Sequence, residues 1–400
     1  MKALRKFLDK IKPNFEEGGK FSKLHSVFEG FETFLFVPDK VTNKGAHIRD
    51  AIDLKRTMII VVMSVIPAML FGVWNVGYQH YLAIGEQGTF FELFWFGLIK
   101  FLPLLIVSYV VGLGIEFVFA QIRGHEINEG FLVSGILIPL IVPINIPLWM
   151  LAVAVAFAVI IGKEVFGGTG MNIWNPALIA RAFLFFAYPS EMSGDKVWVE
   201  GLRNIDPSKL VDGFSGATPL AQFAAEGGDA TGKLVDGLGN NLSVFDMFMG
   251  WIPGSIGETS TIAILIGAAI LIYTGIGSFK IMISTVAGGL AMGFLLNILG
   301  PETNVYMQIP PYYHLIIGGF AFGAIFMATD PVSAAQTSTG KIIYGFLIGI
   351  IAVLIRVLNP AYPEGMMLSI LLMNTFAPLI DHYVVQSNIK RRLKRVKKLA

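Results

Sequence analysis

Cysteine is absent from this chain of 400 residues. Its absence excludes disulfides, thiolate-bound zinc and cysteine-ligated iron–sulfur clusters. The six histidines fall mostly in loops or at the ends of apolar segments, which disfavours a bis-histidine haem. Any redox group must then be organic or a haem, and a flavin fits the composition.

Charged residues are also scarce, at 14% of the chain, whereas apolar residues make up 54%. The mean hydropathy is +0.66, and several apolar runs reach the length of about 20 residues that spans a bilayer. The first fifty residues interleave Lys, Asp, Glu and Phe without an apolar run that small residues follow, so a cleaved signal peptide is not expected. The composition indicates a polytopic membrane protein.

Ten apolar segments are candidate membrane spans, and several are short for a full crossing and interrupted by Gly or Pro. They are Thr57 to Gly77, Phe91 to Phe119, Gly130 to Val142, Leu148 to Ile161, Pro176 to Ala187, Thr261 to Gly277, Ile281 to Leu299, Leu315 to Ala328, Ile342 to Leu358 and Met366 to Ile380. We therefore expect an all-α polytopic membrane protein with about ten transmembrane helices, some of them broken.

The segments fall into two groups of five with matching landmarks. Gly130-Phe131 and Gly319-Phe320 open short spans, and Asn-Pro-Ala at 175–177 and at 359–361 precedes the last span of each group. An odd number of spans per group predicts two inverted repeats, which place binding sites where broken helices meet. The alternative is that Gly and Pro are simply common in membrane helices.

The charge distribution predicts the topology. The basic N-terminal segment and the tail from Lys390 to Lys398 belong in the cytoplasm, and the polar interval from Tyr188 to about Glu258 then lies in the periplasm. The expected parts are an N-terminal cytoplasmic segment (1–53), a first membrane repeat (54–190), a periplasmic loop (191–257), a second repeat (258–383) and a basic cytoplasmic tail (384–400). The tail is interpreted as a topology anchor rather than a nucleic-acid or lipid patch.

Two glycine-containing runs are candidate ligand sites. Ser215-Gly216-Ala217-Thr218 lies in the polar interval, where small residues leave room for a bulky group on the Thr218 hydroxyl; the alternative is a surface turn. Residues 167–170 (Gly-Gly-Thr-Gly) resemble a phosphate cradle but lack the Lys and Ser/Thr ending of a nucleotide loop, and a tight turn between spans is the preferred interpretation. No strand-associated Gly-x-Gly-x-x-Gly fingerprint is found, so this chain is not expected to bind NADH itself.

Ionisable residues within the candidate spans are costly, at about 2.5 to 3.5 kcal/mol each at a helix centre. Those singled out are Glu116, Arg181 and Arg356 within spans, and Asp330 and Asp381 at span ends. The acids either bind a transported cation or anchor helix ends by pairing with Lys or Arg. The two arginines are expected to neutralise such acids or a flavin.

Spaced motifs along almost the whole chain resemble those of the B-type membrane component of the bacterial sodium-translocating NADH:quinone oxidoreductase. They lie at 163–170 (KEVFGGTG), 175–177 (NPA), 181–189 (RAFLFFAYP), 215–218 (SGAT), 253–258 (PGSIGE), 327–333 (MATDPVS) and 359–367 (NPAYPEGMM). The homologous D-type component of the Rnf complex resembles the same pattern, and the N-terminal extension from Met1 to Asp50 favours the quinone reductase.

The resemblance implies two flavins and a sodium pathway. FMN would be joined through its phosphate to Thr218, and riboflavin would bind non-covalently near Asn172 and Asn175. Without the resemblance, Asn175 before Pro176 is typical of a helix N-cap. Glu116, Asp330 and Asp381 match acids that the family associates with sodium, a cation that oxygen ligands suit.

The resemblance also implies a quinone site and partners. Gly112, Asn128, Glu129, Gly130 and Phe131 match residues linked to quinone, where glycine would admit a flat headgroup and Phe131 would stack on it. Implied partners are an NADH-oxidising flavoprotein, a periplasmic FMN protein of the same complex, small membrane components, ubiquinone, Na⁺ and a flavin transferase, with no nucleic acid. The location would be the bacterial inner membrane. Rival hypotheses are a channel or secondary transporter without redox chemistry and a structural anchor for other members of a complex.

Overall fold

The computed structural model describes residues 2–16, 18–21, 28, 32, 36, 42–46, 48, 52, 54–123, 130–203, 209–225, 234–301, 304–359 and 364–399. Within these ranges the regular structure is helical, and the only strand-like pairing is an isolated bridge between Val235 and Asn241. Six of the described helices are long and apolar enough to cross a membrane, and three shorter helices are also apolar. The prediction of an all-α membrane protein is confirmed at this level.

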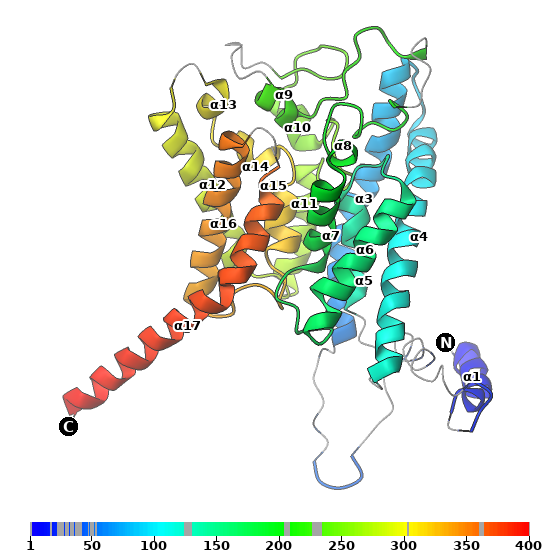
Figure 1. Ribbon diagram of the computed structural model, residues 1–400, viewed down its shortest axis with the longest axis vertical. Coiled ribbons are helices and arrows are strands. Elements are labelled where there is room, and N and C mark those ends of the chain that lie inside the picture. The colour runs from blue at the N-terminus through cyan, green and yellow to red at the C-terminus, as the bar shows by residue number, and fades with distance from the viewer. Residues whose placement is uncertain are drawn as a thin grey trace.

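Five helices form the first part of the bundle (Figure 1). They are α3 (Leu54–Ile84), α4 (Phe90–Arg123), α5 (Phe131–Ile141), α6 (Leu148–Gly162) and α7 (Pro176–Ala187). The bounds of α7 equal the predicted span, whereas α3 and α4 continue beyond theirs at both ends. Polar residues at a membrane surface can continue a helix, so the apolar run gives only its minimum length.

The second part contains α11 (Thr261–Tyr273), α12 (Phe279–Leu299), α16 (Ser338–Leu358) and α17 (Met366–Leu399). The single span predicted from Leu315 to Ala328 is wrong. The chain there is divided into α14 (Tyr313–Ile316), α15 (Phe320–Phe322) and a π-helical turn, η5 (Gly323–Met327). Ile317 is extended and Gly318 has a φ of +64°, so the backbone leaves the helical conformation between α14 and α15.

The bundle has two distinguishable ends in Figure 1. One end, here called the loop side, carries α8 (Pro189–Met192), α9 (Pro219–Ala225), α10 (Val244–Met249) and α13 (Val305–Gln308). The other end, the termini side, carries α1 (Lys2–Ile11) with the turns η1 (Lys12–Asn14) and η3 (Glu164–Phe166), and α17 extends away from the bundle there.

Glycine allows the longest helices to pack backbone against backbone. A Cβ added to Gly97 of α4 would lie 1.8 Å from the carbonyl oxygen of Val73 in α3. On the other side of the bundle, a Cβ on Gly288 of α12 would lie 2.1 Å from the carbonyl oxygen of Phe346 in α16. Membrane helices associate through such close contacts because lipid supplies no hydrophobic driving force between them.

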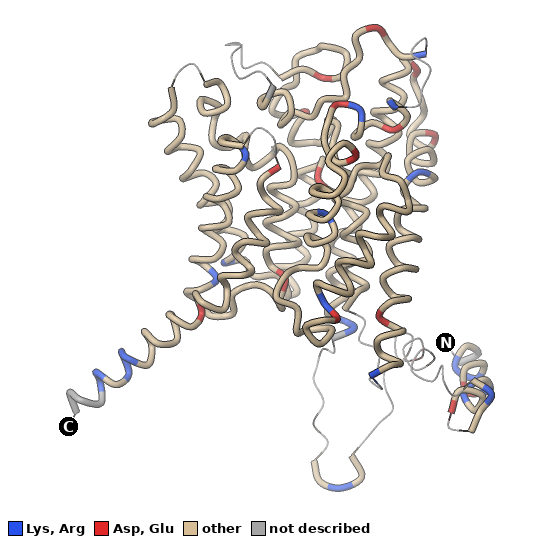
Figure 2. The backbone as a smooth tube through the Cα atoms, viewed as in Figure 1, with Lys and Arg blue, Asp and Glu red and all other residues tan. Residues whose placement is uncertain are grey.

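The distribution of polar and apolar side chains agrees with a bilayer around the bundle. Large apolar residues such as Trp95, Ile99 and Val110 are more than 60% exposed along α4. Charged residues lie mostly toward the two ends of the bundle in Figure 2. Where α17 projects beyond the bundle, Lys390 and Arg391 are exposed.

Candidate functional site

Thr218 precedes the short helix α9 and lines a cavity on the loop side. Its Oγ1 accepts a hydrogen bond of 3.2 Å from the backbone N–H of Ala221, as an N-cap residue does. The cavity, here called the loop-side cavity, is bounded by α7, α9, the segments 192–198 and 252–259, Gly318 and Glu364. The Thr218 side chain is half-buried and borders this space.

Gly216 has a different role from the one expected. The sequence suggests that it keeps the chain near Thr218 accessible, but it is buried. A Cβ at this position would lie 2.2 Å from the carbonyl oxygen of Asp195. Glycine is therefore needed because the loop backbone packs directly against it, whereas Ser215 is exposed.

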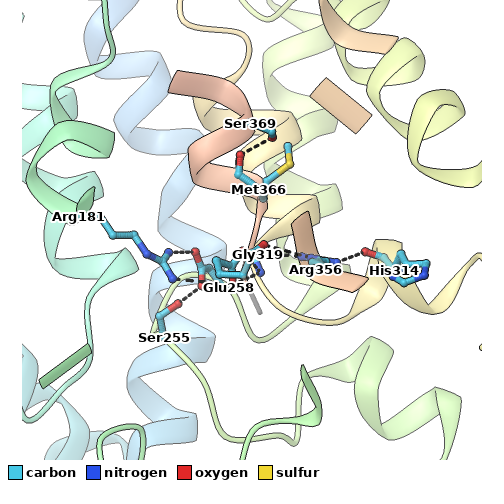
Figure 3. A network of polar contacts seen from close by, with 9 residues as sticks. Arg181, Ser255, Glu258, His314, Gly319, Arg356, Met366 and Ser369 are labelled. Carbon is cyan, nitrogen blue, oxygen red and sulfur yellow. Dashed lines mark hydrogen bonds and ion pairs between the residues drawn. The ribbon is translucent and has the colours of Figure 1, made fainter. Parts of the chain in front are cut away.

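Four charged side chains form a largely buried network beside the loop-side cavity, which Arg181, Glu258 and Glu364 line (Figure 3). Arg181 of α7 lies 2.5 Å from Glu258, and its other terminal nitrogen lies 3.8 Å from Glu364. Arg356 of α16 lies 3.7 Å from Glu364 and donates a 2.6 Å hydrogen bond to the backbone carbonyl of His314. This four-charge cluster contains two arginines and two acids, so each arginine lies beside an acid. The acids are Glu258 and Glu364, not the span acids Glu116, Asp330 and Asp381 that the sequence analysis considers.

Backbone and hydroxyl groups complete the cluster. Ser255 donates to the carboxylate of Glu258, and the N–H of Gly319 donates to Glu364 at 3.1 Å. The helix α9 packs onto the same place, because a Cβ on Gly318 would lie 2.3 Å from Cδ1 of Leu220. The cluster thus joins α7, the segment before α11, α16 and the turn before α17 beneath the helix that follows Thr218.

A second cavity lies on the termini side and contains several of the predicted ligand residues. Asn172, Asn175, Asp330 and Gly130 all line it, together with Lys163. Its remaining lining is mixed, with Ser134, Thr169 and Thr329 beside Val133, Leu137 and Phe326. This termini-side cavity therefore brings together residues predicted separately for riboflavin, sodium and quinone.

The segment before α7 is held in place by its own side chains. The amide of Asn172 donates to the carbonyl oxygen of Trp174 at 2.9 Å, and the Trp174 indole donates to Thr375 of α17 at 2.9 Å. The side-chain oxygen of Asn175 accepts from the N–H of Ala177 at 3.0 Å and caps α7. The N-cap interpretation of Asn175 is confirmed, and its amide N–H groups are not used by the cap.

Glu116 forms a buried ion pair with Lys163. Their side chains are 5% and 4% exposed, and Lys163 donates to one carboxylate oxygen. The other oxygen of Glu116 is buried without a hydrogen-bond partner among the described residues. The adjacent Glu164 pairs with Arg123 at 2.9 Å. Glu116 thus has the lysine partner that the helix-anchoring hypothesis required.

The other two predicted sodium residues organise turns. Asp330 accepts from the hydroxyl of Ser333 at 2.5 Å and from its N–H at 3.2 Å. Asp381 of α17 accepts from the N–H groups of Gln336 and Thr337, at 2.6 and 3.0 Å, and so holds the residues before α16, whose N-cap is Thr337. Within the described ranges, no three acids or histidines cluster tightly enough to hold a metal ion.

The predicted quinone residues are only partly described, since Asn128 and Glu129 lie outside the described residues. Gly112 and Phe131 face one another, and a Cβ on Gly112 would lie 2.0 Å from the Phe131 ring. Phe131 is fully buried. The space that glycine leaves at Gly112 is therefore filled by the phenylalanine ring.

Three charged residues of these sites are missed by reasoning from the sequence, namely Lys163, Glu258 and Glu364. All three lie just outside a predicted span, where the sequence prediction considers only Asp330 and Asp381. A sequence signal is nevertheless present, because all three fall within the motifs that carry the resemblance. Their burial and partners come only from the tertiary structure.

Comparison with known proteins identifies relatives over the full chain. Proteins named as the B component of Na(+)-translocating NADH-quinone reductase are similar to it. That of Ectopseudomonas mendocina (strain ymp) is 50% identical, with 98% of this chain and 99% of the relative covered. That of Stutzerimonas stutzeri (strain A1501) is 49% identical with the same coverage. That of Chromohalobacter salexigens is 48% identical, with 98% and 97% covered.

The sequence model of the NQR2, RnfD, RnfE family matches residues 41–390, which is most of the chain. Together with relatives of about half identical sequence over nearly the whole length, this match shows that the chain belongs to the NQR2, RnfD, RnfE family.

Proposed function

We propose that this chain is the membrane component of a Na⁺-translocating NADH:quinone oxidoreductase that carries covalent FMN on Thr218 and riboflavin near Asn172 and Asn175. These flavins would supply the electron carriers between NADH and ubiquinone, and electron flow would be coupled to Na⁺ export across the bacterial inner membrane. The single observation that carries the proposal is that the two predicted flavin sites border two separate cavities, one at each end of the bundle.

The donor set of the termini-side cavity suits a flavin. The Lys163 ammonium and the Asn172 and Asn175 amides can serve the polar edge of an isoalloxazine, whereas Leu137 and Phe326 supply apolar wall for its other end. The loop-side cavity also suits a flavin tethered at Thr218, because Arg181 and Ser255 line the same space. Each cavity combines apolar walls with a few polar groups, as cofactor sites usually do.

Helix packing supports the two inverted repeats (54–190 and 258–383). In the first part α4 packs on α6, α6 on α7, α3 on α5 and α5 on α7. In the second part α12 packs on α16, α16 on α17, α11 on η5 and η5 on α17, although the packing of α3 on α4 has no counterpart of similar extent between α11 and α12. The broken segment α14–η5 then corresponds to the short helix α5, and such broken helices line the sites of inverted-repeat transporters.

The basic tail and the topology rule support a cytoplasmic termini side and a periplasmic loop side. The electrons would then enter at the periplasmic Thr218 and leave near the cytoplasm. Glu116, Asp330 and Asp381 are proposed to influence Na⁺ passage from positions near the termini side. The other members of the complex would supply NADH oxidation, and a flavin transferase would modify Thr218. The names of the relatives and their alignment over 98% of the chain favour this function over an Rnf-type one.

The test is intact mass and in-gel flavin fluorescence of the denatured chain, expressed together with its flavin transferase. Wild type should gain the mass of FMN minus water, and Thr218→Ala should lose both the added mass and the fluorescence. The neighbouring hydroxyl provides a matched control, since Ser215→Ala should keep both. A wild-type chain without flavin beside an active transferase would overturn the proposal and favour a transporter without redox chemistry.

A further inference from the structure

Among the described residues, Lys163 contributes the only basic side chain to the lining of the termini-side cavity. It follows the last turn of α6 and is 3% exposed. Its Nζ lies 3.4 Å from where a Cβ on Gly130 would be, and Gly130 lines the same cavity. The ammonium group is therefore at the wall of the cavity that also holds Asn172 and Asn175.

The acids around Lys163 come from three parts of the chain. Glu116 of α4 is its direct partner, and one Glu116 oxygen has no hydrogen bond within the described part of the chain. Asp330, after η5, lines the same cavity as Lys163. Glu164 of η3 is paired with Arg123 instead. With every group ionised, Lys163 faces two acids, Glu116 and Asp330.

A flavin that takes up one electron without a proton gains one negative charge on its ring system. In the proposed complex this electron originates from NADH through the preceding carrier. A cation at the wall of a buried cavity stabilises the charged ring more than it stabilises the neutral oxidised ring, because low dielectric strengthens the attraction. A carboxylate beside that cation weakens the effect.

We propose that Lys163 faces the riboflavin of the termini-side cavity and stabilises its reduced, anionic form, and that Glu116 limits this effect by sharing the Lys163 charge. The inference deepens the proposed function, because it needs riboflavin in that cavity. Lys163 contacts the cofactor, whereas Glu116 acts through Lys163 and is a positioning residue. The two residues should then act on the flavin in opposite directions.

The experiment compares the purified complex carrying Lys163→Gln, Lys163→Arg or Glu116→Gln in this chain. Non-covalent riboflavin is quantified after denaturation, and its midpoint potential is measured by spectroelectrochemical titration. Lys280→Gln is the matched control, because Lys280 lies on the termini side, bonded to Ser338 and outside the cavity lining.

Lys163→Gln should shift the equilibrium between oxidised and reduced riboflavin at least tenfold toward the oxidised form. For a one-electron couple this is a fall of about 59 mV. Glu116→Gln should raise the potential, because the Lys163 charge is then no longer shared. Lys163→Arg keeps the positive charge, so its equilibrium between oxidised and reduced riboflavin should stay within a few-fold of the wild-type value. The same is expected for Lys280→Gln.

The outcomes separate this inference from the function on which it rests. Wild-type complex without riboflavin would refute the proposed function itself. With riboflavin present, the midpoint potentials of Lys163→Gln and Glu116→Gln decide. The role of Lys163 is overturned if neither potential shifts, or if both shift in the same direction. If Lys163→Gln loses its riboflavin, Glu116→Gln decides, since it keeps the lysine: a raised potential supports the proposal, and an unchanged one rejects it.

Discussion

The four-charge cluster predicts strong energetic coupling between Arg181 and Glu258. Their side chains are 4% and 5% exposed and lie 2.5 Å apart. Arg181→Gln leaves the cluster with two carboxylates and one guanidinium, and Glu258→Gln leaves it with two guanidinium groups and one carboxylate. Removing one partner of a buried ion pair costs about 3–5 kcal/mol, because the other charge stays buried without compensation.

The double variant Arg181→Gln/Glu258→Gln restores neutrality, so its cost should be well below the sum of the two single costs. We expect a coupling energy of about 2–3 kcal/mol, at the upper end of the range for residues in contact. The free energy of unfolding of the detergent-purified chain, titrated with a denaturing detergent and followed by circular dichroism, measures all three variants against wild type.

A surface pair on the same side of the molecule provides the control. Arg203 and Glu191 also form an ion pair, but their side chains are 34% and 16% exposed. Arg203→Gln should cost less than about 1 kcal/mol, because water screens an exposed pair. The reasoning is refuted if Arg181→Gln costs no more than this control, or if the costs of the two single variants simply add.

Three further predictions concern packing and helix capping. Gly97→Ala should destabilise the bundle by about 1–3 kcal/mol through its contact with Val73, whereas Gly114→Ala in the same helix, with open space around it, should be neutral or stabilising in the same unfolding titration. Asp381→Ala should cost about 1 kcal/mol by removing the hydrogen bonds that hold Gln336 and the N-cap residue Thr337 before α16, and Asp381→Asn less; a Na⁺-uptake defect in Asp381→Asn with unchanged stability would instead support a role in transport. Asn175→Ser retains a cap for α7 but removes the amide, so loss of riboflavin at wild-type stability would assign that amide to the flavin; retained riboflavin would leave Asn175 a cap alone.

Most helices could be predicted from apolar length alone, and the failures have physical causes. The bounds of α7 are predicted in full because Asn175 and Pro176 mark its start. The segment from Leu315 to Ala328 is one apolar run in the sequence, yet the backbone leaves the helical conformation at Gly318. A hydropathy profile does not reveal that departure, because glycine is neither strongly apolar nor strongly polar.

Side-chain roles divide in the same way. The sequence offers helix capping as one interpretation of Asn175, and neutralisation of acids or of a flavin as the role of Arg181 and Arg356. It does not indicate which acids they meet. Glu258 is 77 positions from Arg181, and only the folded bundle brings the two side chains together.

The sequence by itself determined the class of protein, the number of apolar segments and the family, because hydrophobic length and motif spacing are properties of the chain. The tertiary structure alone decided that Lys163 meets Glu116 across 47 positions, that Phe131 fills the space over Gly112, and that Asn172 and Asp330 border one cavity. These contacts depend on how helices cross and how closely glycine lets them approach. Neither property is encoded in the composition of any single segment.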